Sequence, residues 1–197
     1  MIKACKKCRR EGEKLMIKGE RCLSPKCAMV KRAFAPGQHG QSSFTKLSEY
    51  GKQLREKQKT RRIYGLGESQ FASCASKAAN IEGNTGDNLM KTLETRLDNV
   101  VYRLGFASSR SQSRQMVSHG LILVNGKKTS IPSYHLKEGD MIEPKEKASL
   151  KEMKSSGVPT WIECDTKKIT GKIKRIPSRE EIDTTVNESL IIEFYSR

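Results

Sequence analysis

Four cysteines near the N-terminus are spaced as metal ligands often are. Cys5 and Cys8 are separated by two residues, Cys22 and Cys27 by four, and thirteen residues lie between the pairs. Each short spacing lets one turn present two thiolates, and two such pairs supply the four soft ligands of a tetrahedral zinc site. The stretch between the pairs is too polar to form a core, so a bound metal would supply the local folding energy. The sequence therefore predicts one structural Zn²⁺ held by these four cysteines.

Two alternatives remain open for this cluster at the level of sequence. The cysteines could be unligated thiols, or they could hold an iron–sulfur cluster, which their charged and solvated neighbours make less favourable. The first residues lack the apolar segment of a secretory signal, so we expect a reducing cytosolic compartment and no disulfides. Cys74 and Cys164 lie outside the pattern, and we expect both to be reduced, buried and inert.

Positive charge is concentrated in two parts of the chain. Lys and Arg outnumber Asp and Glu by 38 to 22, which gives a net charge of +16. Residues 1–64 hold 18 basic and 5 acidic side chains and residues 91–128 hold 7 and 2, whereas residues 129–197 hold 12 of each. Such self-repulsion favours a polyanionic partner. No apolar run approaches the roughly 18 residues of a membrane span, so we expect nucleic acid and no membrane.

The first basic part combines a tight turn with a helix. Proline and glycine in Pro36–Gly40 predict a turn that exposes backbone amides, where His39 could contact RNA or simply be solvated. Residues 47–64 have helical periodicity, with apolar side chains on one face. A second face carries cations at the helical repeat: Lys52, Arg55, Lys59 and Arg62. Such a line neutralises phosphates without reading bases, although a solvated charged face is the alternative.

The second basic part predicts a small α/β module. An amphipathic helix over 93–104 ends at Gly105, and a second helix, capped by Ser108 or Ser109, ends at Gly120. Residues 121–129, with their central Asn-Gly pair, predict a β-hairpin, and residues 140–143 are a candidate third strand. This arrangement brings four cations into one cleft suited to RNA shape: Arg110, Arg114, Lys127 and Lys128.

Further elements follow from the remaining patterns. Residues 68–88 contain a weaker helix and then turn formers over 82–88, which we interpret as a domain boundary. Residues 157–164 and 168–173 alternate enough to be strands that complete the sheet, with Trp161 as a core residue. By propensity alone, residues 190–195 are also a strand.

Several of these motifs together resemble a known family. The segments Arg96–Ala107, Ser109-Arg110, Val117–Gly120 and Val124–Gly126 resemble the small RNA-binding domain named after ribosomal protein S-four, which also occurs in some RNA-modifying enzymes. The resemblance extends to the ribosomal protein S-four family over essentially the whole chain. The further motifs are the four cysteines, Pro36–Gly40, Leu47–Gly51, Leu54–Lys59 and Glu193–Ser196.

The resemblance implies an α+β fold in three parts. These are a basic N-terminal arm with a zinc knuckle (1–45), a helical domain to which the tail returns (46–90 with 180–197), and an inserted RNA-binding domain of two helices on a small, mostly antiparallel sheet (91–179). The tail would then pack on the helical domain instead of forming a strand. The chain departs from the family where it has Leu121 in place of a common histidine and Ser113 in place of a common alanine, and His119 could be an RNA contact or a helix cap.

The resemblance also implies a structural, non-enzymatic role in the cytoplasmic small ribosomal subunit. The expected partners are a junction in the 5′ domain of small-subunit rRNA, ribosomal proteins S-five and S-three, and mRNA on its way into the ribosome, with no small-molecule substrate. It further implies early assembly, translational accuracy with S-five and S-twelve, and repression of its own messenger. The side chains that we predict to contact RNA are Arg9, Arg10, Lys31, Arg32, His39, Lys52, Arg55, Lys59, Arg61, Arg62, Arg96, Arg103, Arg110, Arg114, His119, Lys127 and Lys128.

Two other classes of function fit the sequence less well. An RNA-modifying enzyme would need a catalytic domain, and none of the three histidines has an acid or nucleophile in a catalytic arrangement. A zinc-dependent DNA-binding regulator would need a recognition helix with base-reading side chains, which no segment resembles.

Overall fold

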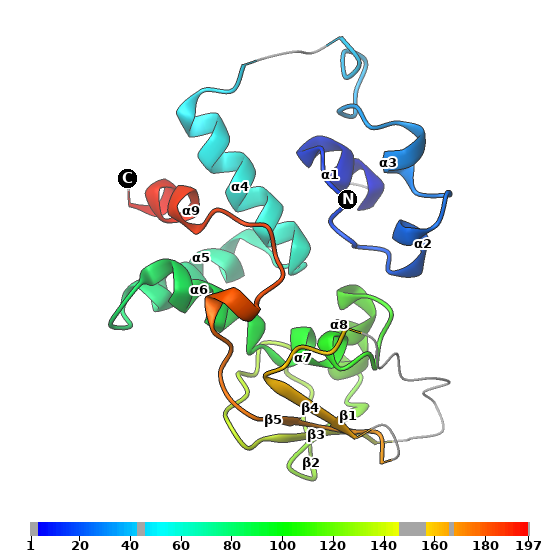
Figure 1. The fold of residues 1–197 in the computed structure, drawn as a ribbon, viewed down its shortest axis with the longest axis vertical. Coiled ribbons are helices and arrows are strands. Elements are labelled where there is room, and N and C mark those ends of the chain that lie inside the picture. Colours follow the sequence, from blue (N-terminus) through cyan, green and yellow to red (C-terminus); the bar gives the residue numbers. More distant parts are fainter. Residues whose placement is uncertain (1–3, 43–45, 146–156, 166–167, 197) are drawn as a thin grey trace. The chain divides into compact units, whose positions relative to one another are not determined.

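The computed structural model describes residues 4–42, 46–145, 157–165 and 168–196 (Figure 1). The chain forms two compact units. The N-terminal unit contains Met1–Ala75 together with Thr185–Arg197, and the central unit contains Ser76–Thr184. The boundaries predicted from the sequence lie after residues 45, 90 and 179. The two units of the structure divide after Ala75 and Thr184, so the turn-rich residues 82–88 lie within the central unit.

The N-terminal unit is helical. Three short helices, α1 (Ala4–Glu11), α2 (Glu20–Leu23) and α3 (Ala28–Lys31), form the arm. The longer helix α4 (Glu49–Ile63) follows, and α5 (Glu68–Ala79) begins in this unit and ends in the central one. Ser48 begins α4, because its hydroxyl accepts a hydrogen bond of 3.2 Å from the amide of Gly51.

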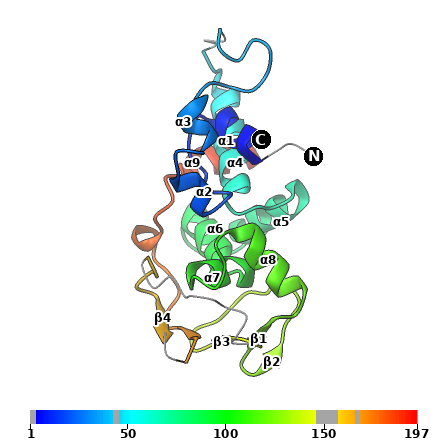
Figure 2. The ribbon, with the colours of Figure 1, turned by 90° about the vertical axis from the view of Figure 1, so that its right-hand side faces the viewer.

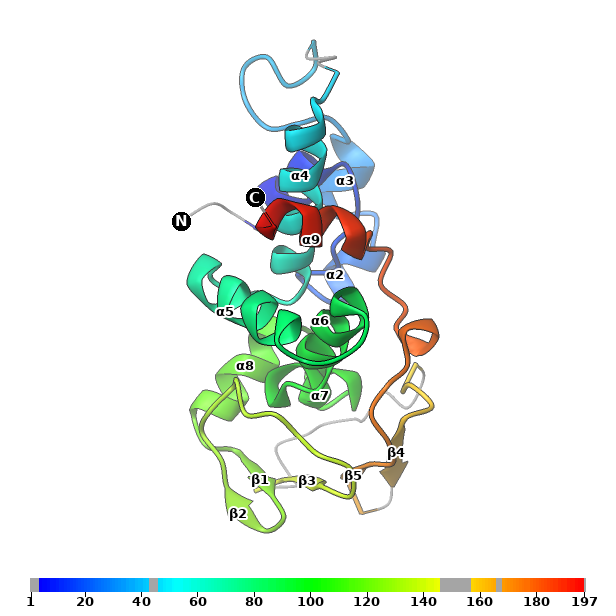
Figure 3. The same ribbon diagram turned by 90° about the vertical axis from the view of Figure 1, so that its left-hand side faces the viewer.

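The C-terminal segment is a helix and not a strand. Helix α9 (Glu188–Tyr195) packs against α4 and crosses it (Figure 3). Asn187 caps it, and Ile191 is fully buried. Phe194 stacks against Tyr50 at 5.7 Å between ring centroids, and the Lys57 ammonium lies 4.3 Å from the Phe194 ring centre. The strand prediction from propensity was therefore wrong, because packing against α4 outweighs the local β preference. The resemblance was right to place the tail on the helical domain.

The central unit confirms the predicted antiparallel sheet and the helix predicted before Gly120, whereas the helix predicted over 93–104 is interrupted, because one helix ends at Glu94 and the next begins at Leu97. Helices α6 (Thr85–Glu94), α7 (Leu97–Arg103) and α8 (Arg110–Ser118) lie on one side of the sheet (Figure 2). Its strands run in the order β2-β1-β3-β5-β4 and each adjacent pair is antiparallel. Their bounds are β1 Ile122–Val124, β2 Lys127–Lys128, β3 Met141–Pro144, β4 Ile162–Asp165 and β5 Thr170–Ile173, and a 3₁₀ helix, Arg179–Glu181, follows.

A hydrophobic cluster joins α7 and α8 to the sheet. Trp161 is 1% exposed within it, as predicted. The remaining buried members come from both helices and sheet and include Leu97, Val100, Leu104, Val117, Ile122, Ile142 and Ile173. Asn125 and Gly126 have φ angles of 52° and 74°, so the Asn-Gly turn predicted from the sequence connects β1 to β2.

Candidate nucleic-acid interface and metal site

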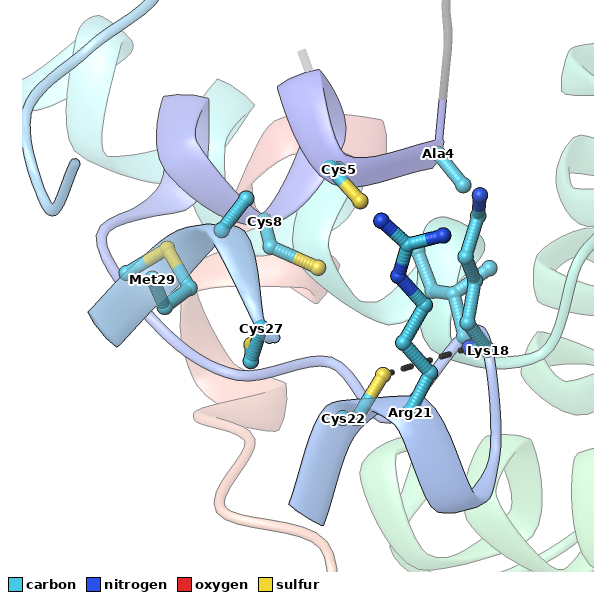
Figure 4. Close-up of a pocket in the computed structure, with 10 residues that line it drawn as sticks. Ala4, Cys5, Cys8, Lys18, Arg21, Cys22, Cys27 and Met29 are labelled. Atoms are coloured by element: carbon cyan, nitrogen blue, oxygen red, sulfur yellow. Dashed lines mark hydrogen bonds between the residues drawn. The ribbon is translucent and has the colours of Figure 1, made fainter. Parts of the chain in front are cut away.

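The four predicted zinc ligands line one pocket of the arm (Figure 4). Cys5 and Cys8 come from α1, Cys22 from α2, and Cys27 immediately precedes α3. All four are free thiols, and all but Cys5 are buried. Three short helices with little apolar surface of their own thus converge on sulfur atoms, as expected of a segment organised by a metal.

Charged and polar groups of the arm surround the thiols, since Lys18 and Arg21 also line the pocket. The Lys18 amide donates to the Cys22 sulfur at 3.3 Å (Figure 4). Burial raises the pKa of the Cys8 thiol, the amide of Leu15 lowers it by hydrogen bonding, and the other three cysteines raise it further. A divalent cation would reverse this preference for the neutral form. Within the described residues, no three potential ligands are close enough to form a coordination shell as they stand, so zinc remains a prediction.

Two glutamates of the arm form ion pairs with cations of α4. The Glu11 side chain is 1% exposed and pairs with Arg55 at 3.3 Å and, more closely, with Arg62. Lys59 is also buried and pairs with Glu13 at 2.9 Å. Burial raises the pKa of the Glu11 carboxyl, although both arginines lower it. The sequence analysis missed these acids, since they lie more than forty residues before their partners along the chain.

The other cations of the N-terminal unit differ in exposure. Lys52 pairs with Glu49 on the surface at 2.7 Å, and Arg61 pairs with Glu68 at 2.9 Å. Arg9 donates to two backbone carbonyls of the arm. The predicted RNA contacts that remain exposed in the arm are Arg10, Lys31, Arg32 and His39.

Two arginines of the central unit are internal. Arg96 is 2% exposed and forms two hydrogen bonds to Asp98, at 3.1 and 2.9 Å. The Arg103 guanidinium donates twice to Glu94, at 3.1 and 2.9 Å, and once to Asp183 at 2.6 Å. Burial lowers the pKa of Arg103, but attraction to Glu94 and Asp183 outweighs it and raises the pKa overall. Neither guanidinium is presented to solvent.

Among the predicted RNA contacts of this unit, the accessible cations lie on helix α8 and strand β2. Arg110 lies 4.5 Å over the Tyr102 ring, and its Nε donates to Asn99 at 2.8 Å, which fixes the guanidinium at the start of α8. Arg114 lies one turn later and is 29% exposed. A Cβ on Gly120 would meet the Lys128 side chain at 2.1 Å, so this lysine passes directly over the end of α8.

The same surface contains the remaining predicted contacts and both departures from the family. Lys127 and His119 are exposed, and His119 is also the C-cap of α8, so the two interpretations of this histidine are compatible. Leu121 is 38% exposed beside it. Ser113 is buried, and its hydroxyl donates to the Asp98 and Arg110 carbonyls at 2.6 and 2.9 Å. This serine on α8 therefore connects α8 to α7 through a hydrogen bond, and its buried hydroxyl is not available to RNA.

None of the helices that the structure describes is both long and apolar enough to cross a membrane.

The chain matches two family models, the ribosomal protein S4/S9 N-terminal domain over residues 2–94 and the S4 domain over residues 95–142. It is 54% identical to small ribosomal subunit protein uS4 of Syntrophomonas wolfei, 52% to that of Azoarcus sp. and 53% to that of Dictyoglomus thermophilum. Each match covers 98% of this chain and 96% of the relative. The chain therefore belongs to the uS4 family of small ribosomal subunit proteins.

Proposed function

We propose that this protein binds small-subunit rRNA as a structural, non-catalytic constituent of the ribosome. The observation that carries the proposal is the accessible cationic surface of Arg110, Arg114, His119, Lys127 and Lys128 on α8 and β2, within the S4 domain. The uS4 names of its relatives support the ribosomal setting. The cations buried in ion pairs stabilise the two units and lie outside the proposed surface.

This surface suits recognition by shape and phosphate position. The Tyr102 ring and the Asn99 amide group hold Arg110 in place, and arginine suits a phosphate because its planar guanidinium can donate two parallel hydrogen bonds. Lys127 and Lys128 are exposed on a two-residue edge strand and act as point charges. With no aromatic platform among these side chains, binding depends on the backbone geometry of folded RNA more than on base identity.

The arm supports a second part of the proposal, namely one structural Zn²⁺ on Cys5, Cys8, Cys22 and Cys27. Four free thiols that share a pocket are the donor set that zinc prefers. Bound zinc would neutralise the thiolates and fix α1, α2 and α3 to one another. The exposed arm cations, together with the turn at Pro36–Gly40, would then form a second, smaller RNA contact.

Finer roles follow from family membership as proposals. They are binding at a junction of the 5′ domain early in assembly, contact with ribosomal proteins S-five and S-three, an effect on accuracy together with S-five and S-twelve, contact with incoming mRNA, and repression of the protein's own messenger. A tagged protein that stays with small subunits in a gradient after a high-salt wash would support the setting. A protein found only in free fractions would contradict it.

Substitution of both β2 lysines tests the RNA surface. We expect K127Q/K128Q to weaken binding to a junction-containing rRNA fragment and to reduce the slope of log affinity against log salt by about 1.4 to 1.8, because each lost phosphate contact removes about 0.7 to 0.9. Filter binding over a salt series measures both quantities.

Lys172 and Lys174 provide the matched control. They are exposed on or next to β5, which is separated from β2 by two strands of the same sheet. K172Q/K174Q changes the net charge equally and should leave the slope unchanged. Equal loss in both double variants would mean that general charge, and not this surface, drives binding.

A further inference from the structure

The Arg9 side chain connects α1 to the loop that precedes α4. Its Nε donates to the Phe34 carbonyl at 2.9 Å, and its Nη2 donates to the Ala35 carbonyl at 3.3 Å. The same guanidinium lies 4.9 Å from the centre of the Phe34 ring. One side chain therefore holds two successive residues of a segment 25 positions away, through two hydrogen bonds and one stacking contact.

The Ala35 carbonyl that Arg9 binds also lies against Gly40, at the far end of the loop. A Cβ on Gly40 would lie only 1.8 Å from this oxygen, so the chain passes directly against it. The Gly40 amide donates to the Gly37 carbonyl at 3.3 Å, and Gly37 has a φ of 123°, which favours glycine. The position of the Ala35 carbonyl thus determines how residues 36–40, with exposed His39, are presented.

We propose that Arg9 is a positioning residue, which holds the Phe34–Gly40 loop in the conformation that contacts rRNA without being a phosphate ligand itself. This rests on the proposed RNA-binding function. Arginine suits the task because its planar, fork-like donors reach two carbonyls while its face stacks on a ring, whereas lysine offers a point charge. Because Arg9 follows Cys8 on α1, folding of the arm and presentation of the loop are linked.

The decisive variant is R9K in the full-length protein, because it separates positioning from charge. If Arg9 bound a phosphate, lysine could replace it. Lysine could not replace the two hydrogen bonds that Arg9 donates to the Phe34 and Ala35 carbonyls. We expect R9K to increase hydrogen exchange of the Gly40 amide by about tenfold in the free protein. We also expect it to weaken binding to the rRNA fragment by about three- to tenfold without changing the salt slope, since residues 34–40 contain no Lys or Arg.

The adjacent residue provides a matched control. Arg10 is exposed on the same helix, and R10K should leave hydrogen exchange at Gly40 unchanged. The variant G40A disrupts the loop directly through the contact with Ala35. If Arg9 acts through the loop, R9K/G40A should bind RNA no more weakly than G40A alone.

Either of two results would overturn the proposal: normal exchange at Gly40 in R9K, or additive losses of affinity in R9K/G40A. Exchange is measured without RNA, so it decides the role of Arg9 in the loop even if the wild-type protein failed to bind the fragment. That failure would count against the proposed function instead.

Discussion

Replacement of Glu94 by glutamine is expected to lower the free energy of unfolding of the central unit by about 3 to 5 kcal/mol. The Glu94 side chain is 1% exposed and accepts hydrogen bonds from Arg103 and from the Asn99 amide. Its loss leaves the buried guanidinium of Arg103 with only Asp183, which is 73% exposed and screened by water. A buried charge without its partner costs far more than a lost surface pair.

Urea unfolding monitored through tryptophan fluorescence measures this change. Trp161 is the only tryptophan of the chain and is 1% exposed in the core of the central unit, so its signal reports on that unit. The exposed Glu163 on β4 provides the control, and E163Q should change stability by less than about 0.5 kcal/mol. Equal stability of E94Q and E163Q would show that the Glu94–Arg103 pair contributes little.

A double variant separates the pair from its surroundings. E94Q/R103M removes the uncompensated cation as well as the carboxylate, so we expect it to be more stable than E94Q alone. If R103M lowers the stability of E94Q by as much as it lowers the stability of the wild-type protein, the two side chains are not coupled. The same logic predicts that R103M acts on RNA binding through stability and leaves the salt slope unchanged.

Removal of the proposed zinc is expected to unfold the arm while the central unit stays folded. Structural zinc contributes about 10 to 16 kcal/mol of apparent binding free energy in small metal-dependent folds at pH 7, and the arm has few buried apolar side chains to replace it. Chelator should therefore make residues 4–42 sensitive to protease and weaken rRNA binding. The fluorescence of Trp161 should not change.

Metal analysis of cysteine variants completes this test. Wild-type protein should contain one zinc per chain, and C8S should contain much less. C164S is the matched control, because Cys164 lies on β4 in the central unit and is not among the four proposed ligands. An arm that resists protease equally in metal-free and metal-loaded protein would contradict a structural role for zinc.

The local elements of the central unit could be predicted from the sequence. The apolar spacing of Leu97, Val100, Val101 and Leu104 determines which face of α7 is buried, and Asn125-Gly126 determines the hairpin turn. Both depend on interactions within a few residues. The four cysteines line one pocket, and their paired spacing suggested a shared site, but zinc itself stays a prediction.

The availability of each cation was decided by the tertiary structure. Periodicity places Lys59 and Arg62 on a polar face of α4, but it cannot reveal that Glu13 and Glu11 bind them from the arm. Likewise, Arg103 acquires Asp183 from 80 residues away, and α9 is a helix because α4 offers it a surface. A cation in water and a cation in an ion pair have the same local sequence pattern. For these cations, the approach of a distant acid depends on the whole fold and determines whether a phosphate can bind.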